Sequence, residues 1–98
     1  LEGKPLSEIG EYVANTYGNR YIIPGIEYWE YISKNPSQAP QELKDSKNSY
    51  FYFGSILRDR RRYWYTPFSH WSGSSFKRTA GWLGHGWISP FRVVLLER

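Results

Sequence analysis

Residues 50–66 read YFYFGSILRDRRRYWYT, and at this point the chain changes from helical to β character. Residues 50–57 are rich in β-forming side chains and show no helical period, which predicts a strand. Residues 63–66 predict a second strand, and we expect Pro67 to end it because proline cannot donate to a β-ladder. Residues 58–62 connect the strands and contain no Gly or Asn for a two-residue turn, so we expect a longer hairpin loop.

Upstream of this hairpin, the apolar spacing predicts two helices. The first spans residues 7–17, with Ser7 as its N-cap and Gly18 as a left-handed C-cap. Its buried stripe follows the spacing of one helix face and consists of Ile9, Tyr12, Val13 and Tyr17. The second helix spans residues 26–34 and ends before Pro36, because a residue that precedes proline disfavours the helical conformation.

The rest of the chain is polar in the middle and β-like at the end. Residues 36–49 predict a loop with one helical turn at 41–44. Short strands are expected at 76–79 and 82–83, where several glycines weaken the pattern. Residues 91–96 form a nearly continuous apolar run, which predicts a final strand at the centre of a sheet with both faces covered.

These elements predict an α+β fold, in which two N-terminal helices pack on a small antiparallel sheet formed by the C-terminal half. The expected organisation is a single domain over residues 1–98, with a helical part at 5–35, a loop at 36–49 and a β part at 50–98. A chain of 98 residues has room for one small domain. Its hydrophobic share of 40% and charged share of 22% are typical of a folded protein.

Missing residue types exclude several classes of site. The chain has no cysteine, which excludes disulfide frameworks, thiolate zinc sites and thiol nucleophiles. No apolar run reaches the roughly 18 residues of a transmembrane helix. Methionine is absent even at position 1, so we expect an excised or processed domain. No targeting segment is recognisable, which favours an intracellular location without naming a compartment.

Charge is distributed unevenly along the chain, whose formal net charge is +4. Residues 50–98 carry eight basic and two acidic side chains, whereas residues 1–49 carry five basic and seven acidic ones. All but one of the eight are arginines, which bind phosphate or carboxylate with two hydrogen bonds and stack on rings. This pattern predicts an anionic partner for the basic half. The alternative is that the halves pair with each other or face solvent.

The strongest functional signal is a cluster of four arginines, Arg58, Arg60, Arg61 and Arg62. Guanidinium groups crowded in this way repel one another unless anions lie among them. At the tip of a hairpin they can spread apart and follow a phosphate backbone, which gives salt-sensitive affinity without sequence readout. The structural alternative is a solvated turn whose charge keeps a sheet edge from pairing with other chains.

Aromatic residues accompany the cluster and make up 19% of the chain, more than a small core can enclose. Four of them are predicted to stack on unpaired bases: Tyr63, Trp64, Tyr65 and Trp71. Lys77 and Arg78 are predicted to contact phosphates together with the arginine cluster. We expect Tyr50 and Tyr52 on the neighbouring strand of the same hairpin. Cross-strand ring pairing is the purely structural alternative.

Residues 69–75 and 81–87 are rich in Ser, Gly and Trp. They are compatible with a flexible loop that holds phosphate, although they match no phosphate-loop pattern. Trp71, Trp82 and Trp87 could instead stack on sugar rings. The third interpretation is a set of tight turns that pack these tryptophans into a second small core.

His70 and His85 are the only histidines. Together they could perform general acid–base chemistry in a metal-independent nuclease, provided that both rings reach one phosphate. Their spacing fits no metal-binding motif, so we expect no metal, and nothing in the sequence indicates a cofactor. A histidine in a glycine-flanked loop is otherwise incidental.

The sequence therefore predicts a small basic, aromatic-rich module that binds a polyanion, nucleic acid in particular, without performing catalysis. The first alternative is a compact nuclease that uses His70 and His85. The second is a protein- or glycan-interaction module with exposed Trp and Tyr side chains. The acidic first helix argues against an anionic membrane as partner. Nothing in the sequence distinguishes DNA from RNA.

Overall fold

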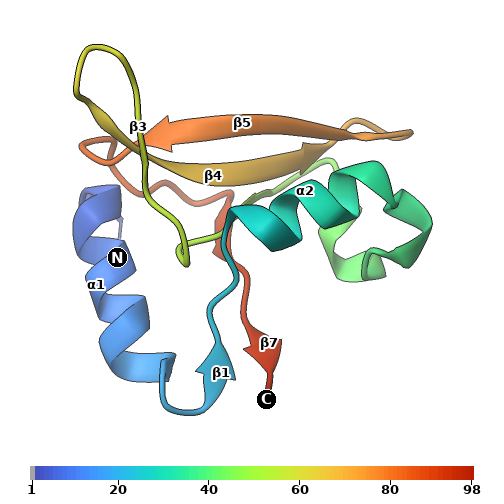
Figure 1. The fold of residues 1–98 in the computed structure, drawn as a ribbon, viewed down its shortest axis with the longest axis horizontal. Helices are drawn as coiled ribbons and strands as arrows, with labels where there is room; N and C mark the ends of the chain where they lie inside the picture. Colours follow the sequence, from blue (N-terminus) through green and yellow to red (C-terminus); the bar gives the residue numbers. More distant parts are fainter. Residues whose placement is uncertain (1) are drawn as a thin grey trace.

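The computed structural model describes residues 2–98, except for the side chain of Arg78 (Figure 1). The helices are α1 (Leu6–Tyr17) and α2 (Ile26–Lys34), followed by 3₁₀ turns at Pro36–Gln38 and Gln41–Leu43. The strands are β1 (Tyr21–Ile22), β2 (Ser49–Phe51), β3 (Leu57–Arg58), β4 (Trp64–Trp71), β5 (Phe76–Trp82), β6 (Phe91–Val93) and β7 (Leu96–Glu97). The helices are N-terminal and the main sheet is C-terminal, so the predicted α+β class is confirmed.

Strand β4 organises the main sheet. On one side it pairs antiparallel with β5, from Tyr65 opposite Trp82 to Trp71 opposite Phe76. On its other side two short strands follow one another, β3 near the start of β4 and β2 near its end. β6 then lies parallel to β2, and β1 pairs with β7 in a separate sheet of two strands. The main sheet is thus mostly antiparallel, as predicted, with one parallel pair.

Pro67 lies inside β4, contrary to the prediction that it ends the strand. In an antiparallel ladder the N–H and C=O groups of one residue point to the same side. The Pro67 carbonyl accepts the Tyr52 N–H at 3.0 Å, so the missing donor of Pro67 faces Tyr52 and not β5. The Thr66 hydroxyl donates to the Tyr52 carbonyl at 3.4 Å instead. The ladder with β5 therefore continues past the proline.

Strand β5 is continuous, whereas the sequence predicts two short pieces separated at Gly81. A Cβ atom added at Gly81 would lie 3.1 Å from both Leu6 Cδ1 and Phe51 Cε1. The glycine therefore allows α1 and Phe51 to pack closely against the strand, and it does not interrupt the strand.

The apolar run 91–96 forms two short strands, and the prediction of one central strand is wrong. β6 lies at the edge of the main sheet, and the chain leaves it at Val94, whose N–H donates to the Phe51 carbonyl at 3.0 Å. Val94 and Leu96 pack in the core with α2, whereas Leu95 packs in the core with α1. Apart from Arg92 the run is apolar because its residues enter two cores.

The N-terminus of α1 is capped by backbone groups that lie far away in the sequence. Pro5 occupies the N-cap position, and the predicted cap, Ser7, lies within the first turn. The N–H groups of Leu6 and Ser7 donate to the carbonyls of His85 and Leu83 at 2.9 and 3.0 Å. No local side-chain cap is needed because these carbonyls satisfy the free donors.

The C-terminus of α1 also differs from the prediction. Gly18 has a φ of −60°, in the right-handed and not the left-handed region. Its carbonyl accepts a hydrogen bond from Arg98 Nη2 at 2.8 Å, which brings a cation to the negative end of the helix. The second helix spans Ile26–Lys34, the predicted bounds, and the turn predicted at 41–44 is the 3₁₀ turn Gln41–Leu43.

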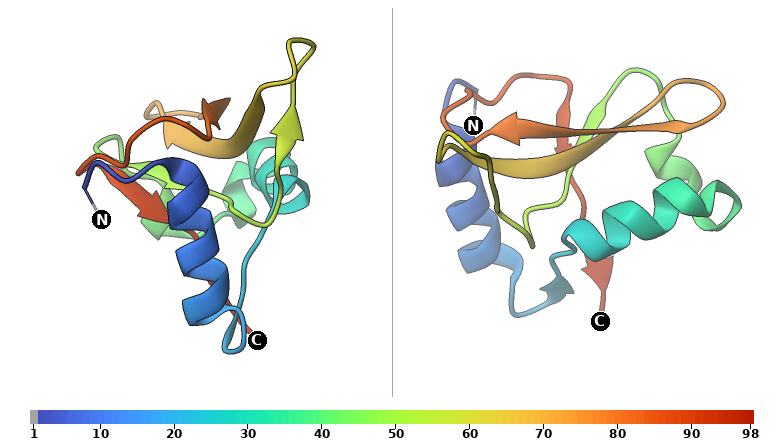
Figure 2. Two further views of the ribbon diagram at one scale, coloured as in Figure 1. Left: turned by 90° about the vertical axis from the view of Figure 1, so that its left-hand side faces the viewer. Right: turned by 45° about the horizontal axis from the view of Figure 1, so that its top comes forward.

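Two hydrophobic cores lie on opposite faces of the sheet. Phe51 and its cross-strand partner Phe68 pack with α1 in the first core. Tyr52, the next residue along the chain, packs with Ile32 of α2 in the second core. Figure 2 shows α1 near the end of the hairpin where β4 begins, and α2 toward the end where β4 finishes. Each face of the β4–β5 hairpin is therefore covered by a helix at one end only.

Candidate functional site

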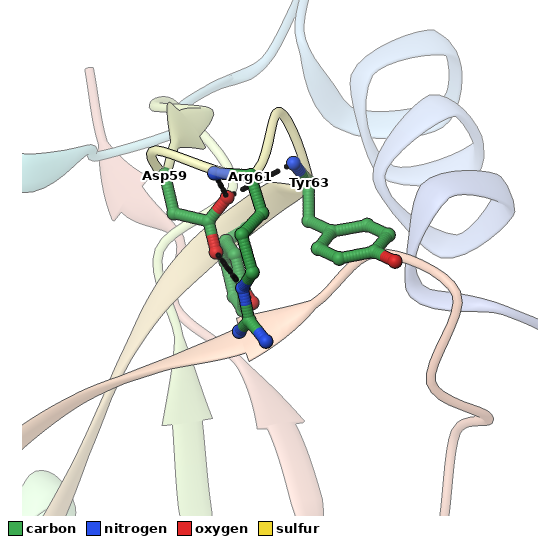
Figure 3. Close-up of polar contacts among 4 residues, drawn as sticks. Asp59, Arg61 and Tyr63 are labelled. Carbon is green, nitrogen blue, oxygen red and sulfur yellow. Dashed lines mark hydrogen bonds and ion pairs between the residues drawn. The ribbon is translucent and has the colours of Figure 1, made fainter.

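The arginine loop, residues 58–63, joins β3 to β4 and is organised by Asp59 (Figure 3). Its Oδ1 atom accepts the N–H groups of Arg61 and Tyr63 at 2.9 and 3.0 Å. Its Oδ2 atom accepts the Tyr65 hydroxyl at 3.1 Å and lies 3.6 Å from Arg61 Nε. Arg62 has a φ of 70°, a conformation uncommon for any residue but glycine. The longer loop is as predicted, and one carboxylate fixes its shape.

Asp59 stays ionised at neutral pH. Partial burial raises the pKa of this carboxyl, but the hydrogen bonds from the Tyr63 N–H, the Tyr65 hydroxyl and the Arg61 N–H outweigh it. The Arg61 charge adds to the same effect, so the pKa of Asp59 lies below its ordinary value. The loop therefore contains one negative charge, held beside Arg61.

The four arginines of the loop have different environments. The guanidinium carbon of Arg58 lies 4.9 Å from the centre of the Trp64 ring, and that of Arg61 lies 5.5 Å from the centre of the Tyr63 ring. Within the described residues, three arginines of the loop form no ion pair with a carboxylate: Arg58, Arg60 and Arg62. The acidic side chains of α1 and α2 thus leave most of the loop's charge uncompensated.

Trp64 lies on the sheet face that α1 covers, directly opposite Arg58 in the β3–β4 ladder. With Ile56, Leu83 and residues of α1, it lines an apolar groove of about 580 Å³. Trp64 is 47% exposed and Ile56 is 60% exposed. This apolar groove runs alongside the arginine loop.

Tyr65 and Trp82 lie on the other face, since residues directly opposite each other in an antiparallel pair share a face. With Tyr63 and Arg61 they line a depression of about 340 Å³, which we call the aromatic depression. Tyr63 is 49% exposed, Trp82 is 51% exposed, and the two rings meet edge to face with centroids 6.4 Å apart. The sequence does not place Trp82 beside the arginines, because this position depends on the β4–β5 register.

Tyr50 and Tyr52 pack with Trp71 and Phe76 in the core with α2 and not beside the arginine loop, and the predicted strand 50–57 is interrupted. The chain turns at Gly54, whose N–H donates to the Pro24 carbonyl at 2.9 Å and where an added Cβ would lie 2.2 Å from a backbone oxygen. Tyr50 therefore pairs with Ser69, near the far end of β4.

Both tyrosine hydroxyls have partners within the protein. The Tyr52 ring is fully buried, and its hydroxyl lies 2.7 Å from Ser69 Oγ. Burial raises the pKa of Tyr52 to about 12. The Tyr50 hydroxyl donates to Asp45, and the pKa of Asp45 is strongly lowered by hydrogen bonds from Tyr50, Asn48 and Lys47. These rings belong to the core and its margin, not to a binding surface.

The remaining predicted contacts lie at the far end of the β4–β5 hairpin. Trp71 is six residues along β4 from Tyr65, about 20 Å at the usual rise of a strand. Its ring is half-buried in the core with α2, 4.8 Å from the Phe76 ring. Lys77 is exposed at this same end, and the side chain of Arg78 lies outside the described residues. The structure thus places Trp71 and Lys77 apart from the arginine loop.

The segments rich in Ser and Gly form turns. Residues 72–75 close the β4–β5 hairpin, with the Ser72 N–H donating to the Ser75 carbonyl at 2.9 Å. Trp87 is buried in the core with α1 and Trp71 is half-buried in the core with α2, whereas Trp82 is exposed. Two of the three tryptophans in these segments, Trp71 and Trp87, therefore pack in a core, as the interpretation of these segments as tight turns predicts.

His70 and His85 lie at opposite ends of the hairpin. His70 is five residues along β4 from Tyr65, about 16 Å, and His85 follows the end of β5 beyond Trp82. The Nδ1 atom of His85 lies 2.7 Å from the Gly86 carbonyl oxygen. The His85 ring lies 5.7 Å from the Phe91 ring, and within the described residues it forms no contact with His70, so the geometry gives the nuclease hypothesis no support. Across residues 2–98, no group of three or more His, Cys, Asp or Glu side chains could hold a metal ion.

Neither helix of the described chain has the length and apolarity needed to cross a bilayer. No protein-family model, curated protein or solved structure matches this chain, so the arginine loop and the rings beside it are the basis for inferring its function.

Proposed function

We propose that this protein binds a polyanion, nucleic acid in particular, through the arginine loop and the exposed rings beside it. The guanidinium groups contact phosphates and the rings stack on bases. The residues at the loop that perform these roles are Arg58, Arg60, Arg61, Arg62, Tyr63, Trp64 and Tyr65.

The pairing of guanidinium groups with exposed rings carries this proposal. Arg58 lies against Trp64 on one face of the hairpin, and Arg61 lies against Tyr63 near the other. Positive charge and a flat apolar surface are the two features with which proteins hold unpaired nucleotides. Arginine supplies both, because its planar guanidinium binds phosphate and stacks on rings.

The uncompensated charge favours an anionic ligand. Each phosphate that Arg58, Arg60 or Arg62 neutralises would release cations condensed on the nucleic acid into solution, which drives binding at low salt. Asp59 holds the loop in one conformation, so less conformational entropy is lost on binding. Contacts of this kind position a strand without reading its sequence.

Fluorescence anisotropy with a labelled oligothymidylate of about 12 nucleotides tests the proposal. We expect saturable binding at low salt that is weakened when Arg58, Arg60 and Arg62 are all changed to Gln. The matched control changes Arg20, Lys34 and Lys47 to Gln, which removes the same charge from positions in the other half of the chain. Equal weakening by both triple variants would mean that net charge, and not the loop, determines binding.

The apolar groove favours one second candidate, the protein-interaction module. Tryptophan is the residue type most enriched at the energetic centre of contacts between proteins, and Trp64 lines this groove. A protein partner in the groove would bind with little salt dependence, and this binding would be lost in the Trp64→Ala variant. An oligonucleotide bound only to the opposite face of the hairpin would not displace such a partner from the groove.

A further inference from the structure

The aromatic depression lies on a part of its sheet face that neither α1 nor α2 covers. On this face, α2 packs against the end of the hairpin that contains Trp71 and Phe76. At the other end the rings of Tyr63 and Trp82 are each about half exposed, at 49% and 51%. A second, shallower hollow is lined by Leu57, Asp59 and Ala80 and also contacts Tyr65, so the open surface continues along β4.

The Trp82 ring is held in place by the chain that follows it. A Cβ atom added at Gly84 would lie 2.6 Å from Trp82 Cζ2 and 2.7 Å from Cη2, so the backbone at Gly84 packs directly on the indole. The His85 N–H donates to the Trp82 carbonyl at 2.9 Å and closes this turn. The edge of the Tyr63 ring abuts the indole at a steep angle of 80°. One part of the indole therefore contacts Gly84 and Tyr63, while about half of the residue stays open to solvent.

Charge defines what can fill the depression. Arg61 lines its rim, close to Tyr63 and 3.6 Å from Asp59. Arg60 and Arg62 are its neighbours in the chain and form no ion pair within residues 2–98. A ligand for this place combines a flat apolar group with at least one adjacent negative charge. Nucleotides have this combination.

We infer that the aromatic depression binds one unpaired nucleobase, stacked on Trp82, with the adjoining phosphates on the arginine loop, so that the protein selects single strands over duplexes. This inference rests on the proposed function and adds the class of nucleic acid. In a duplex the base faces are stacked on each other and only their edges are accessible in the grooves. A base reaches an aromatic ring in a depression only when it is unpaired or extruded.

Competition anisotropy with three unlabelled ligands tests the inference. The ligands are an oligothymidylate of about 12 nucleotides, an abasic deoxyribose phosphate oligomer of the same length, and a duplex of mixed sequence. Stacking of one base predicts that the oligothymidylate binds about 5- to 150-fold more tightly than the abasic oligomer. The same preference is expected over the duplex at equal salt.

Three variants assign the preference to the ring. Trp82→Ala should lower the preference for the oligothymidylate by about 5- to 150-fold and leave affinity for the abasic oligomer unchanged. Trp82→Phe keeps an aromatic surface and should retain most of the preference. Tyr31→Ala removes a ring that is also 49% exposed, on α2, and should change nothing. Thermal unfolding by circular dichroism confirms that each variant is folded.

The outcomes separate this inference from the proposed function. If wild-type protein binds the abasic oligomer as tightly as the oligothymidylate, the base site is refuted while phosphate binding stands. The base site is also refuted if Trp82→Ala keeps the full preference. If none of the three ligands binds at low salt, the proposed function fails and the base site fails with it.

Discussion

Changing Arg58, Arg60 and Arg62 together to Gln should flatten the salt dependence of oligonucleotide binding. Within the described residues these side chains have no carboxylate partner, so they are free to take phosphates as counterions. On a single strand, each phosphate neutralised contributes about −0.7 to the slope of log affinity against log salt. Three contacts therefore contribute a slope of about −2.

This slope converts into a measurable loss of affinity. A fourfold rise in salt, from about 50 to about 200 mM, should weaken the wild-type protein by about 20-fold more than the triple variant. Anisotropy titrations with the labelled oligothymidylate at several salt concentrations provide both slopes. The control variant with Arg20, Lys34 and Lys47 changed to Gln should keep the wild-type slope. A triple-loop variant whose slope equals that of the wild type would refute the assignment of these arginines to phosphates.

Three further predictions concern single contacts. Asp59→Ala should weaken oligonucleotide binding in the anisotropy assay although it raises the net charge by one, because the Arg61 and Tyr63 N–H groups and the Tyr65 hydroxyl lose their acceptor and the loop loosens. Gly84→Ala should displace the Trp82 ring and reduce the preference for the oligothymidylate over the abasic oligomer, with the melting temperature little changed. Tyr52 has a pKa of about 12 in the folded protein against 10.0 for the ordinary group, so its contribution to stability is full below pH 10 and is lost as the pH rises toward 12. Urea unfolding at about pH 9 and about pH 11 should show a larger loss in the wild type than in Tyr52→Phe, in which Tyr28 and Tyr50 still have raised pKa values.

The sequence predicted those elements whose signals are local. The second helix has a clear apolar face and a proline just beyond its end, and its bounds in the structure are those predicted. Pro67 and Gly81 misled the strand prediction, because each is accommodated by a contact made from elsewhere in the chain, Tyr52 at the proline and Leu6 at the glycine. The caps of α1 could not be predicted for the same reason.

The candidate site shows the same division between local and distant information. The arginine loop follows directly from its composition, and Asp59 is a turn residue that the sequence identifies. Trp82 is 24 positions after Arg58 and reaches the loop only through the β4–β5 register. The same register places Trp71 and Lys77 at the other end of the hairpin, so they are not part of the site. The composition of the chain identified arginines and aromatic rings as the candidate binding groups. The pairing of β4 with β5 determines which of these rings lie beside the arginine loop.

Charge by itself does not distinguish a binding loop from a solvated turn. Two unit charges about 4 Å apart in water interact by only about 1 kcal/mol, and salt reduces this further. A turn that merely protects a sheet edge can therefore hold several arginines at little cost in free energy, and its backbone does not need a fixed conformation.

The arginine loop is ordered, since Asp59 accepts hydrogen bonds from Arg61, Tyr63 and Tyr65. Ordering the loop backbone costs conformational entropy, and binding is tighter when this cost is met before the ligand arrives. Asp59→Ala separates the two cases because it removes a negative charge and, at the same time, the acceptor of all three hydrogen bonds that order the loop. Tighter oligonucleotide binding by this variant would show that charge alone acts, and weaker binding would show that the preformed loop is the binding element.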